Sequence, residues 1–238
     1  MDVDAGAFQL GAAGFVSKPV DFRQLARIIQ DSTFFDELIR DMEQARHHVH
    51  LETFLWEDGF VSDLIVPALI AAAQRGIEVR VLVDHRGAMT TNPKVWARLR
   101  DGGVDFRVYH RARLRELGFY NNRDHRKIAV LDGRVAYVGG HCVVDTWTGD
   151  AQDKEHYRDL SVRLEGPIVH DVQSAFSENW VAETGELFAG EAVFPELEAR
   201  GSITAHVARI RPTTSASAVK IFHYMAVCMA RERLWIQN

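Results

Sequence analysis

Hydrophobic and polar positions in the first half of the chain alternate between the spacing of a strand and that of a helix. Short apolar runs lead into longer amphipathic stretches that end at glycines or begin at a proline. After a helix over residues 34–45, the pattern predicts strands over 48–55, 77–84 and 105–109, separated by helices over 61–74 and 93–100. This alternation is typical of a parallel sheet covered by helices.

A hairpin is predicted next. Apolar runs at residues 128–131 and 135–138 flank Asp132-Gly133, a dipeptide that favours a tight turn. After a polar loop, the pattern predicts a strand over 159–164 and a helix over 167–180, then a strand over 203–210 and an apolar helix over 216–231. We therefore predict an α/β fold whose mixed sheet carries helices on both faces.

Candidate chemistry stands at the start of this hairpin. His125 and Lys127 are two residues apart, so in a strand their side chains project to the same side and can meet one phosphate group. Imidazole can attack phosphorus to form a phospho-histidine, while an ammonium stabilises the charge on the phosphoryl oxygens. This chemistry requires no metal ion and no other cofactor.

The stretch from His125 to Asp132 resembles the H-x-K-x4-D signature of the phospholipase D superfamily. The resemblance implies that His125, Lys127 and Asp132 belong to the catalytic motif. For Asp132 two interpretations stay open, because the same residue fits the hairpin turn without any catalytic part. The pattern continues to Gly139-Gly140, a substrate-binding candidate because backbone can approach a ligand closely at glycine.

Other segments extend the likeness to cardiolipin synthases. Residues 157–162, 165–167 and 176–180 resemble the segment that follows the motif in those enzymes, and 45–54 and 76–84 resemble their first two strands. The resemblance implies a phospholipase D-like domain over residues 34–200. It also implies a phosphatidyltransferase that moves a phosphatidyl group from a phospholipid to a lipid alcohol. Attack of water on the same intermediate would make a phosphodiesterase instead.

The motif departs from the family pattern just after the glycines. Family members usually have Gly-Gly-x-Asn there, but Cys142 fills the asparagine position, and a thiol is only a weak donor. His141 is therefore a candidate substitute in substrate binding. Asp159 lies near where the family places an acid that orients the histidine, and an exposed ion pair with Arg158 or Arg163 is the alternative.

A second motif is absent, since among all histidines of the chain only His125 is followed by lysine two positions later. Family members combine two motifs, so we expect half of an active site. Residues 234–238 resemble the strand that opens the second half of cardiolipin synthases, so residues 201–238 are interpreted as the beginning of a truncated second lobe. Completion by homodimerisation is an alternative, and a non-catalytic phosphate- or lipid-binding remnant is another.

Residues 1–33 form a separate N-terminal segment in this interpretation. Residues 11–22, followed by Leu25, Ile28 and Ile29, resemble the last strand and helix of response-regulator receiver domains. Lys18 matches their lysine, but the aspartate that it would contact lies outside the sequence. The alternative is an ordinary glycine-rich turn followed by a helix that begins near a proline.

Composition narrows the picture further. The chain has 238 residues, a formal net charge of -5 and two cysteines, which suits a reducing, cytoplasmic setting and argues against a nucleic-acid partner. No apolar stretch is long enough to span a membrane, so we expect at most peripheral membrane contact. Arginines at 107, 111, 113 and 115, with His110, face either solvent or an anionic surface. Histidines 47, 48 and 50 lack the spacing of a known metal site.

Overall fold

The computed structural model describes residues 8–10, 14–16, 33–109, 123–201, 205–209 and 218–234. Its central feature is a six-stranded sheet with the strand order β5-β4-β3-β6-β7-β8. The parallel strands are β3 (His48–Thr53), β4 (Glu78–Asp84) and β5 (Asp105–Tyr109). The antiparallel strands are β6 (Ile128–Leu131), β7 (Val135–Gly139) and β8 (Ser161–Glu165). The predicted mixed sheet is confirmed.

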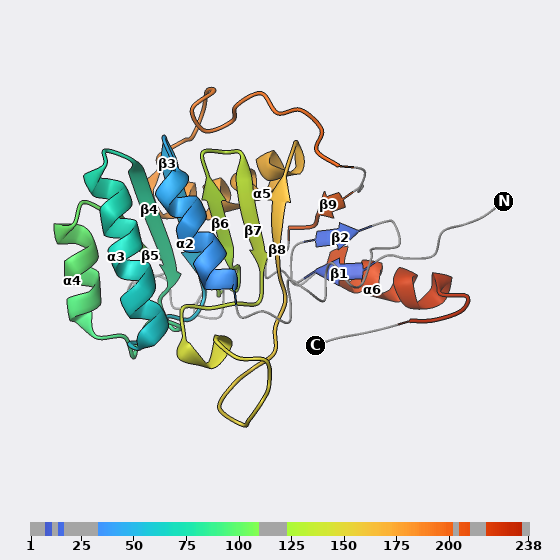
Figure 1. The fold of residues 1–238 in the computed structure, drawn as a ribbon. Coiled ribbons are helices and arrows are strands. Elements are labelled where there is room, and N and C mark those ends of the chain that lie inside the picture. Colours follow the sequence, from blue (N-terminus) through green and yellow to red (C-terminus); the bar gives the residue numbers. More distant parts are fainter. Residues whose placement is uncertain are drawn as a thin grey trace, which may run out of the picture.

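Helices cover both faces of this sheet (Figure 1). One face packs against α2 (Phe34–Gln44), α3 (Phe60–Gln74) and α4 (Pro93–Asp101). The other face packs against α5 (Ile168–Thr184). Because both faces are covered, all six residues of the central strand β3 are buried, including the polar side chains of His48, His50 and Glu52.

Most predicted boundaries agree with the structure within about two residues. The strand predicted from residue 159 begins at Ser161, because the Asp159 carboxylate accepts a hydrogen bond from the Leu160 amide before the strand pairing starts. Helix α5 continues past residue 180 to Thr184 and ends at Gly185. Gly185 has a φ of 76°, the left-handed conformation in which helices commonly terminate.

The two ends of the chain meet in a second, three-stranded sheet. Strands β1 (Phe8–Leu10) and β2 (Gly14–Val16) pair antiparallel, and β2 also pairs with β9 (Ala205–Val207). Helix α6 (Ala218–Met229) follows. The predicted helix near residue 25, Lys18, most of the arginine cluster and residues 235–238 lie outside the described residues. The division at residues 33 and 200 stays a prediction.

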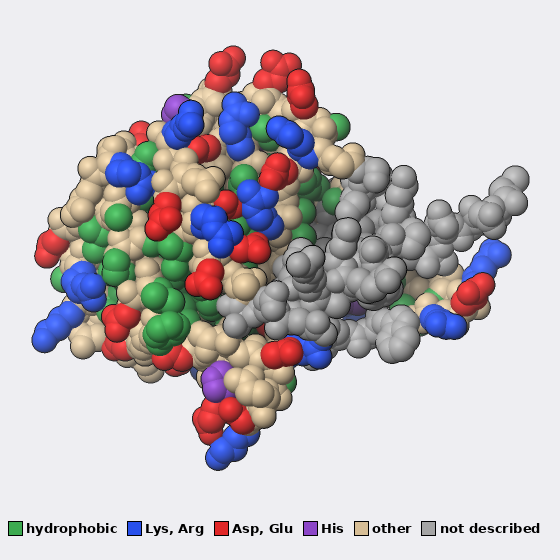
Figure 2. All heavy atoms as spheres, in the orientation of Figure 1, with side chains coloured by type: hydrophobic (Ala, Val, Ile, Leu, Met, Phe, Trp, Pro, Cys, Tyr) green, Lys and Arg blue, Asp and Glu red, His purple; other side chains and the backbone are tan. Residues whose placement is uncertain are grey.

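The surface carries both signs of charge. On the face shown in Figure 2, basic and acidic side chains of the described residues are interspersed. In these same ranges, no helix combines the length and the apolar character that crossing a bilayer would need.

Candidate active site

His125 and Lys127 come together just before β6. The Lys127 Nζ lies 3.0 Å from His125 Nδ1 and donates to the His125 carbonyl at 2.8 Å. The Phe54 ring underlies both groups, at 4.7 Å from the His125 ring centroid and 5.4 Å from the ammonium. His125 is exposed, so the imidazole and the ammonium can both reach a ligand from solvent. The expected convergence of alternate positions is present, while the catalytic roles stay a prediction.

Burial and neighbouring charges shift the pKa values of this pair. Partial burial lowers the pKa of His125, the Lys127 charge lowers it further, and Asp84 opposes both effects. The imidazole is therefore neutral at neutral pH, as a nucleophile must be. Burial also lowers the pKa of Lys127, and nearby groups that include Asp159 offset this in part.

The segment that carries the pair is anchored by Asp84, the last residue of β4. One Asp84 oxygen accepts from the amides of Arg86 and Gly87, at 2.8 and 3.1 Å. The other accepts from the Asp124 amide at 2.9 Å. A single buried carboxylate thus joins the loop after β4 to the residue that precedes His125.

Glu52 is a site-adjacent residue that the sequence analysis did not select. It is fully buried at the end of β3, where the Asn179 amide of α5 donates to it at 2.6 Å. Nearby, Arg126 forms an ion pair with Glu178 at 2.8 Å. The sequence could have indicated Glu52, because it places a carboxyl group inside a strand predicted to be buried, and an acid is rarely buried without a partner.

Gly139 and Gly140 lie close against residues 159–161, the segment that leads into β8. A Cβ atom on Gly140 would overlap the Asp159 carboxylate, and one on Gly139 would overlap Ser161 Oγ and the Leu160 carbonyl. The Gly140 amide also donates to the Leu160 carbonyl at 3.1 Å. Glycine is therefore required here for the close approach of the segment entering β8, and substrate binding at these glycines stays a prediction.

His141 is held within the packing beneath α2. Its ring stacks on Phe34 with 4.4 Å between centroids, and its Nδ1 lies 2.7 Å from Ser161 Oγ. Burial lowers the pKa of His141 to about 4, so the ring is neutral. Cys142 is buried beside it, and burial raises the pKa of its thiol. Substrate binding by His141 stays a prediction, with packing as its observed role.

Asp159 accepts hydrogen bonds from the Trp147 indole at 2.8 Å and from the Leu160 amide at 2.7 Å. The alternative ion pairs do not involve it, since Arg158 and Arg163 bind other carboxylates. Its charge contributes to the field at Lys127. Asp159 therefore lies near the pair and is fixed in place, which is compatible with the proposed site.

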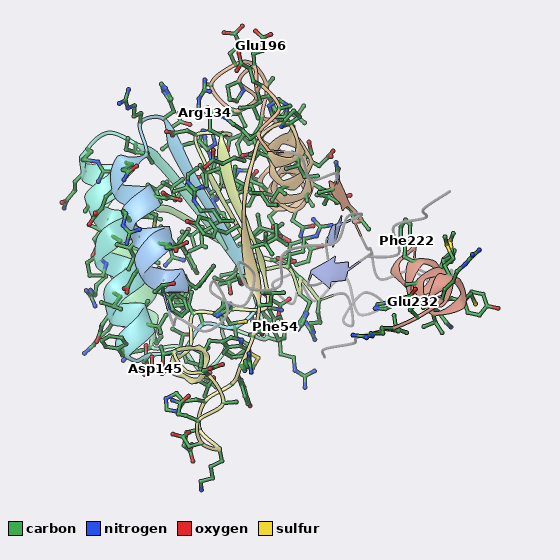
Figure 3. All side chains as sticks on the ribbon, turned by 45° about the vertical axis from the view of Figure 1, so that its right-hand side comes forward. Phe54, Arg134, Asp145, Glu196, Phe222 and Glu232 are labelled. Atoms are coloured by element: carbon green, nitrogen blue, oxygen red, sulfur yellow. The ribbon has the colours of Figure 1, made fainter. Side chains whose placement is uncertain are left out.

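Asp132 lies at the other end of the hairpin strand from His125. The four residues of β6, which lie between them, alone span about 13 Å at ~3.3 Å per residue. Figure 3 shows Phe54, beside His125, and Arg134, in the turn, at opposite ends of the sheet. The Asp132 carboxylate accepts from three successive backbone amides, those of Arg46, His47 and His48. The structure does not bring Asp132 into the site, and its contacts are those of a turn residue.

The histidines of β3 are packed inside the protein. His48 stacks on His50, and His50 stacks on Phe176 of α5, with centroids 4.3 and 4.6 Å apart. His50 Nδ1 also lies 3.0 Å from the Gln173 side-chain oxygen. Within the described ranges, no group of three or more histidine, cysteine or acidic side chains is arranged to hold a metal ion.

A mixed α/β sheet with helices on both faces, and an imidazole and an ammonium side by side just before its interior strand β6, are compatible with the phospholipase D class. The family model described as "Cardiolipin synthase, PLD-like domain" matches residues 38–180, more than half of the chain. The protein therefore belongs to the cardiolipin synthase family of phospholipase D-like proteins.

Curated relatives agree with this assignment. The chain is 29% identical over 207 residues to the major cardiolipin synthase ClsA of Bacillus subtilis (strain 168), an alignment that covers 86% of this chain and 43% of the relative. It is 28% identical to cardiolipin synthase 2 of Staphylococcus epidermidis, covering 86% of this chain and 42% of that protein. The chain thus spans less than half the length of these relatives. Among solved structures, NucT from Helicobacter pylori matches with 17% identity and a TM-score of 0.48, covering 70% of this chain and 93% of that one.

Proposed function

We propose that this chain provides one half of the active site of a cardiolipin synthase-type phosphatidyltransferase, in which His125 becomes a phospho-histidine. The observation that carries the proposal is the convergence of His125 and Lys127, 3.0 Å apart at an exposed strand end. The substrate is a phospholipid at the cytoplasmic membrane surface, met by peripheral contact, and nucleic acid is not a partner.

The contact between the pair sets the order of events. In the resting state that we propose, the Lys127 ammonium donates to Nδ1 and occupies its lone pair, which leaves the ring proton on Nε2. Attack on phosphorus needs a ring nitrogen with a free lone pair. A substrate phosphate must therefore draw the Lys127 ammonium onto its own oxygens before His125 attacks, which couples substrate binding to activation of the nucleophile.

The chemistry then has two displacements. A His125 ring nitrogen forms a bond to phosphorus, the bond from phosphorus to the leaving alcohol oxygen breaks, and that oxygen takes a proton from a second histidine. The acceptor alcohol next attacks phosphorus, returns a proton to the second histidine and releases His125. Because His125 is the sole histidine in the sequence with lysine two positions later, the second histidine belongs to a second motif. A linked motif on a longer polypeptide and a second copy of this chain are its two sources.

Covalent trapping tests the proposal. The purified protein is incubated with vesicles of phosphatidylglycerol labelled at the phosphate and then denatured, and the labelled residue is identified by peptide mapping. We expect an acid-labile label on His125. His125→Ala and Lys127→Ala should abolish it, whereas His47→Ala, which removes an exposed histidine at the far end of the sheet, should retain it.

The concentration dependence and the products separate the alternatives. If two copies complete the site, the label rises with the fraction of dimer measured by sedimentation. If labelling requires an added second motif, the site is completed by another polypeptide segment. Release of the label to water identifies a phosphodiesterase, and transfer to a lipid alcohol identifies a synthase. A folded protein that never labels, alone or with the second motif, contradicts the catalytic proposal.

A further inference from the structure

Two carboxyl groups lie unusually close together behind His125. Glu52 is fully buried and Asp124 is 3% exposed. One oxygen of each carboxyl group accepts a hydrogen bond. Asn179 Nδ2 donates to Glu52 Oε1 at 2.6 Å, and the Arg126 amide donates to Asp124 Oδ1 at 3.2 Å. The remaining oxygens, Glu52 Oε2 and Asp124 Oδ2, are buried, and no N–H or O–H donor within the described ranges reaches either of them.

The Glu52 and Asp124 side chains lie within hydrogen-bonding reach of each other, so each of these two unpaired oxygens is a candidate partner for the other. Two ionised carboxylates are both acceptors only, so such a contact requires a proton on one of them. As an acid and a carboxylate, the pair leaves neither oxygen without a partner, whereas two carboxylates would leave both unsatisfied in a buried place.

We propose that Glu52 and Asp124 share one proton, and that this acid pair is a positioning element for the segment that carries His125 and Lys127. The positioning role rests on the function proposed above, but the shared proton does not.

The charges around the pair favour this state. Burial raises the pKa of Glu52, and the neighbouring Asp124 raises it further. Four further groups that carry or can acquire a negative charge face this region. They are Asp84 from β4, Tyr109 from β5, and Glu178 and Glu183 from α5. The compensating cation is Arg126, which is already bound to Glu178 at 2.8 Å and to the Ala175 carbonyl at 2.6 Å. Lys127 is a second cation that attracts Asp124, and its ammonium already donates to the His125 carbonyl at 2.8 Å.

The pair is placed where it fixes the site. Asp124 is held through its amide by Asp84 and through its side chain by Glu52, and Arg126 is held by α5. His125 lies between these two anchored residues with its ring exposed. Loss of the proton would make the two carboxylates repel each other, displacing Asp124 and with it the imidazole.

The proton can be detected through stability. Since the folded state holds a proton that the unfolded state releases near pH 4, the pair stabilises the fold at low pH, and that stability is lost as the pH rises toward the folded pKa. Glu52→Gln imitates the protonated acid, with an oxygen for Asn179 and an N–H for Asp124. We expect the unfolding constant of the wild type, divided by that of Glu52→Gln, to rise about tenfold per pH unit above about pH 5.

Urea denaturation measures this ratio between about pH 5 and 8, where the carboxyl groups of the unfolded chain, with an ordinary pKa of about 4, are ionised. Glu43→Gln, which removes an exposed carboxyl from α2, is the matched control and should give a flat ratio. Asp124→Asn supplies the second variant, because its amide can donate to an ionised Glu52, and it should show the same slope as Glu52→Gln. Flat ratios for both variants would overturn the shared proton.

The positioning role is tested by the titration of His125, followed by NMR of the labelled imidazole. In Glu52→Ala the His125 pKa should return toward the ordinary value of about 6.5, and Glu52→Gln should restore the wild-type titration. Unchanged His125 titration in Glu52→Ala would refute the positioning role. Neither measurement needs turnover, so a protein that fails the trapping experiment can still hold the proton, and a catalytically active protein can lack it.

Discussion

Replacing Asp132 by alanine separates its turn role from a catalytic one. The carboxylate accepts three backbone amides, at 2.9, 2.8 and 3.0 Å, across a sequence separation of more than eighty residues. Hydrogen bonds to a charged group contribute about 1.5–3 kcal/mol each. The contribution is at or below the lower end of this range where the amides can bind water once the carboxylate is removed. Asp132 also has a φ of 54°, a left-handed conformation that costs alanine about 1 kcal/mol.

These terms give an expected loss of about 3 kcal/mol in the free energy of unfolding for Asp132→Ala. Asp132→Asn keeps one acceptor oxygen and tolerates the left-handed backbone, so its loss should be about 1 kcal/mol. Urea denaturation followed by circular dichroism measures both. A loss below about 0.5 kcal/mol for alanine, or equal losses for the two variants, would refute the reasoning, since the expected difference exceeds the usual effect of a surface substitution. Folded Asp132→Ala should still label at His125, and selective loss of labelling would restore the catalytic interpretation.

Three further outcomes follow from the packing. Burial lowers the pKa of His50, so the fold loses stability as the pH falls below about 6.5, and His50→Gln should weaken that acid dependence in urea titrations by up to about 1.4 kcal/mol per pH unit. Exposed Cys228 should react with a thiol reagent in the native protein, whereas buried Cys142 should react only after unfolding. Gly140→Ala should displace Asp159, lower the thermal midpoint and reduce labelling of His125, and unchanged values would contradict the close approach drawn from the structure.

Much of the fold could be predicted from local patterns. The hairpin strands at residues 128–131 and near 135–138 and the alternation of strands and helices follow from side-chain periodicity and turn chemistry. The proximity of His125 and Lys127 is also local, because positions two apart in an extended segment share a face.

The surroundings of the site depend on contacts between distant residues. Glu52 comes from β3 and Asp124 from the segment before β6, and strand pairing alone brings them together. The position of Asp132 illustrates the same limit, since the motif places it near His125 in sequence while the strand carries it to the opposite end of the sheet.

The sequence by itself therefore determined the element types, the α/β class and the adjacency of the two reactive groups, because each depends on spacing within a few residues. The tertiary structure alone decided which acids lie behind the imidazole, which amides the turn aspartate binds, and which backbone presses on the paired glycines. Those contacts join segments that are far apart in the sequence, so the pattern of hydrophobic and polar positions does not reveal them. They form only when burial of both sheet faces fixes the strand order.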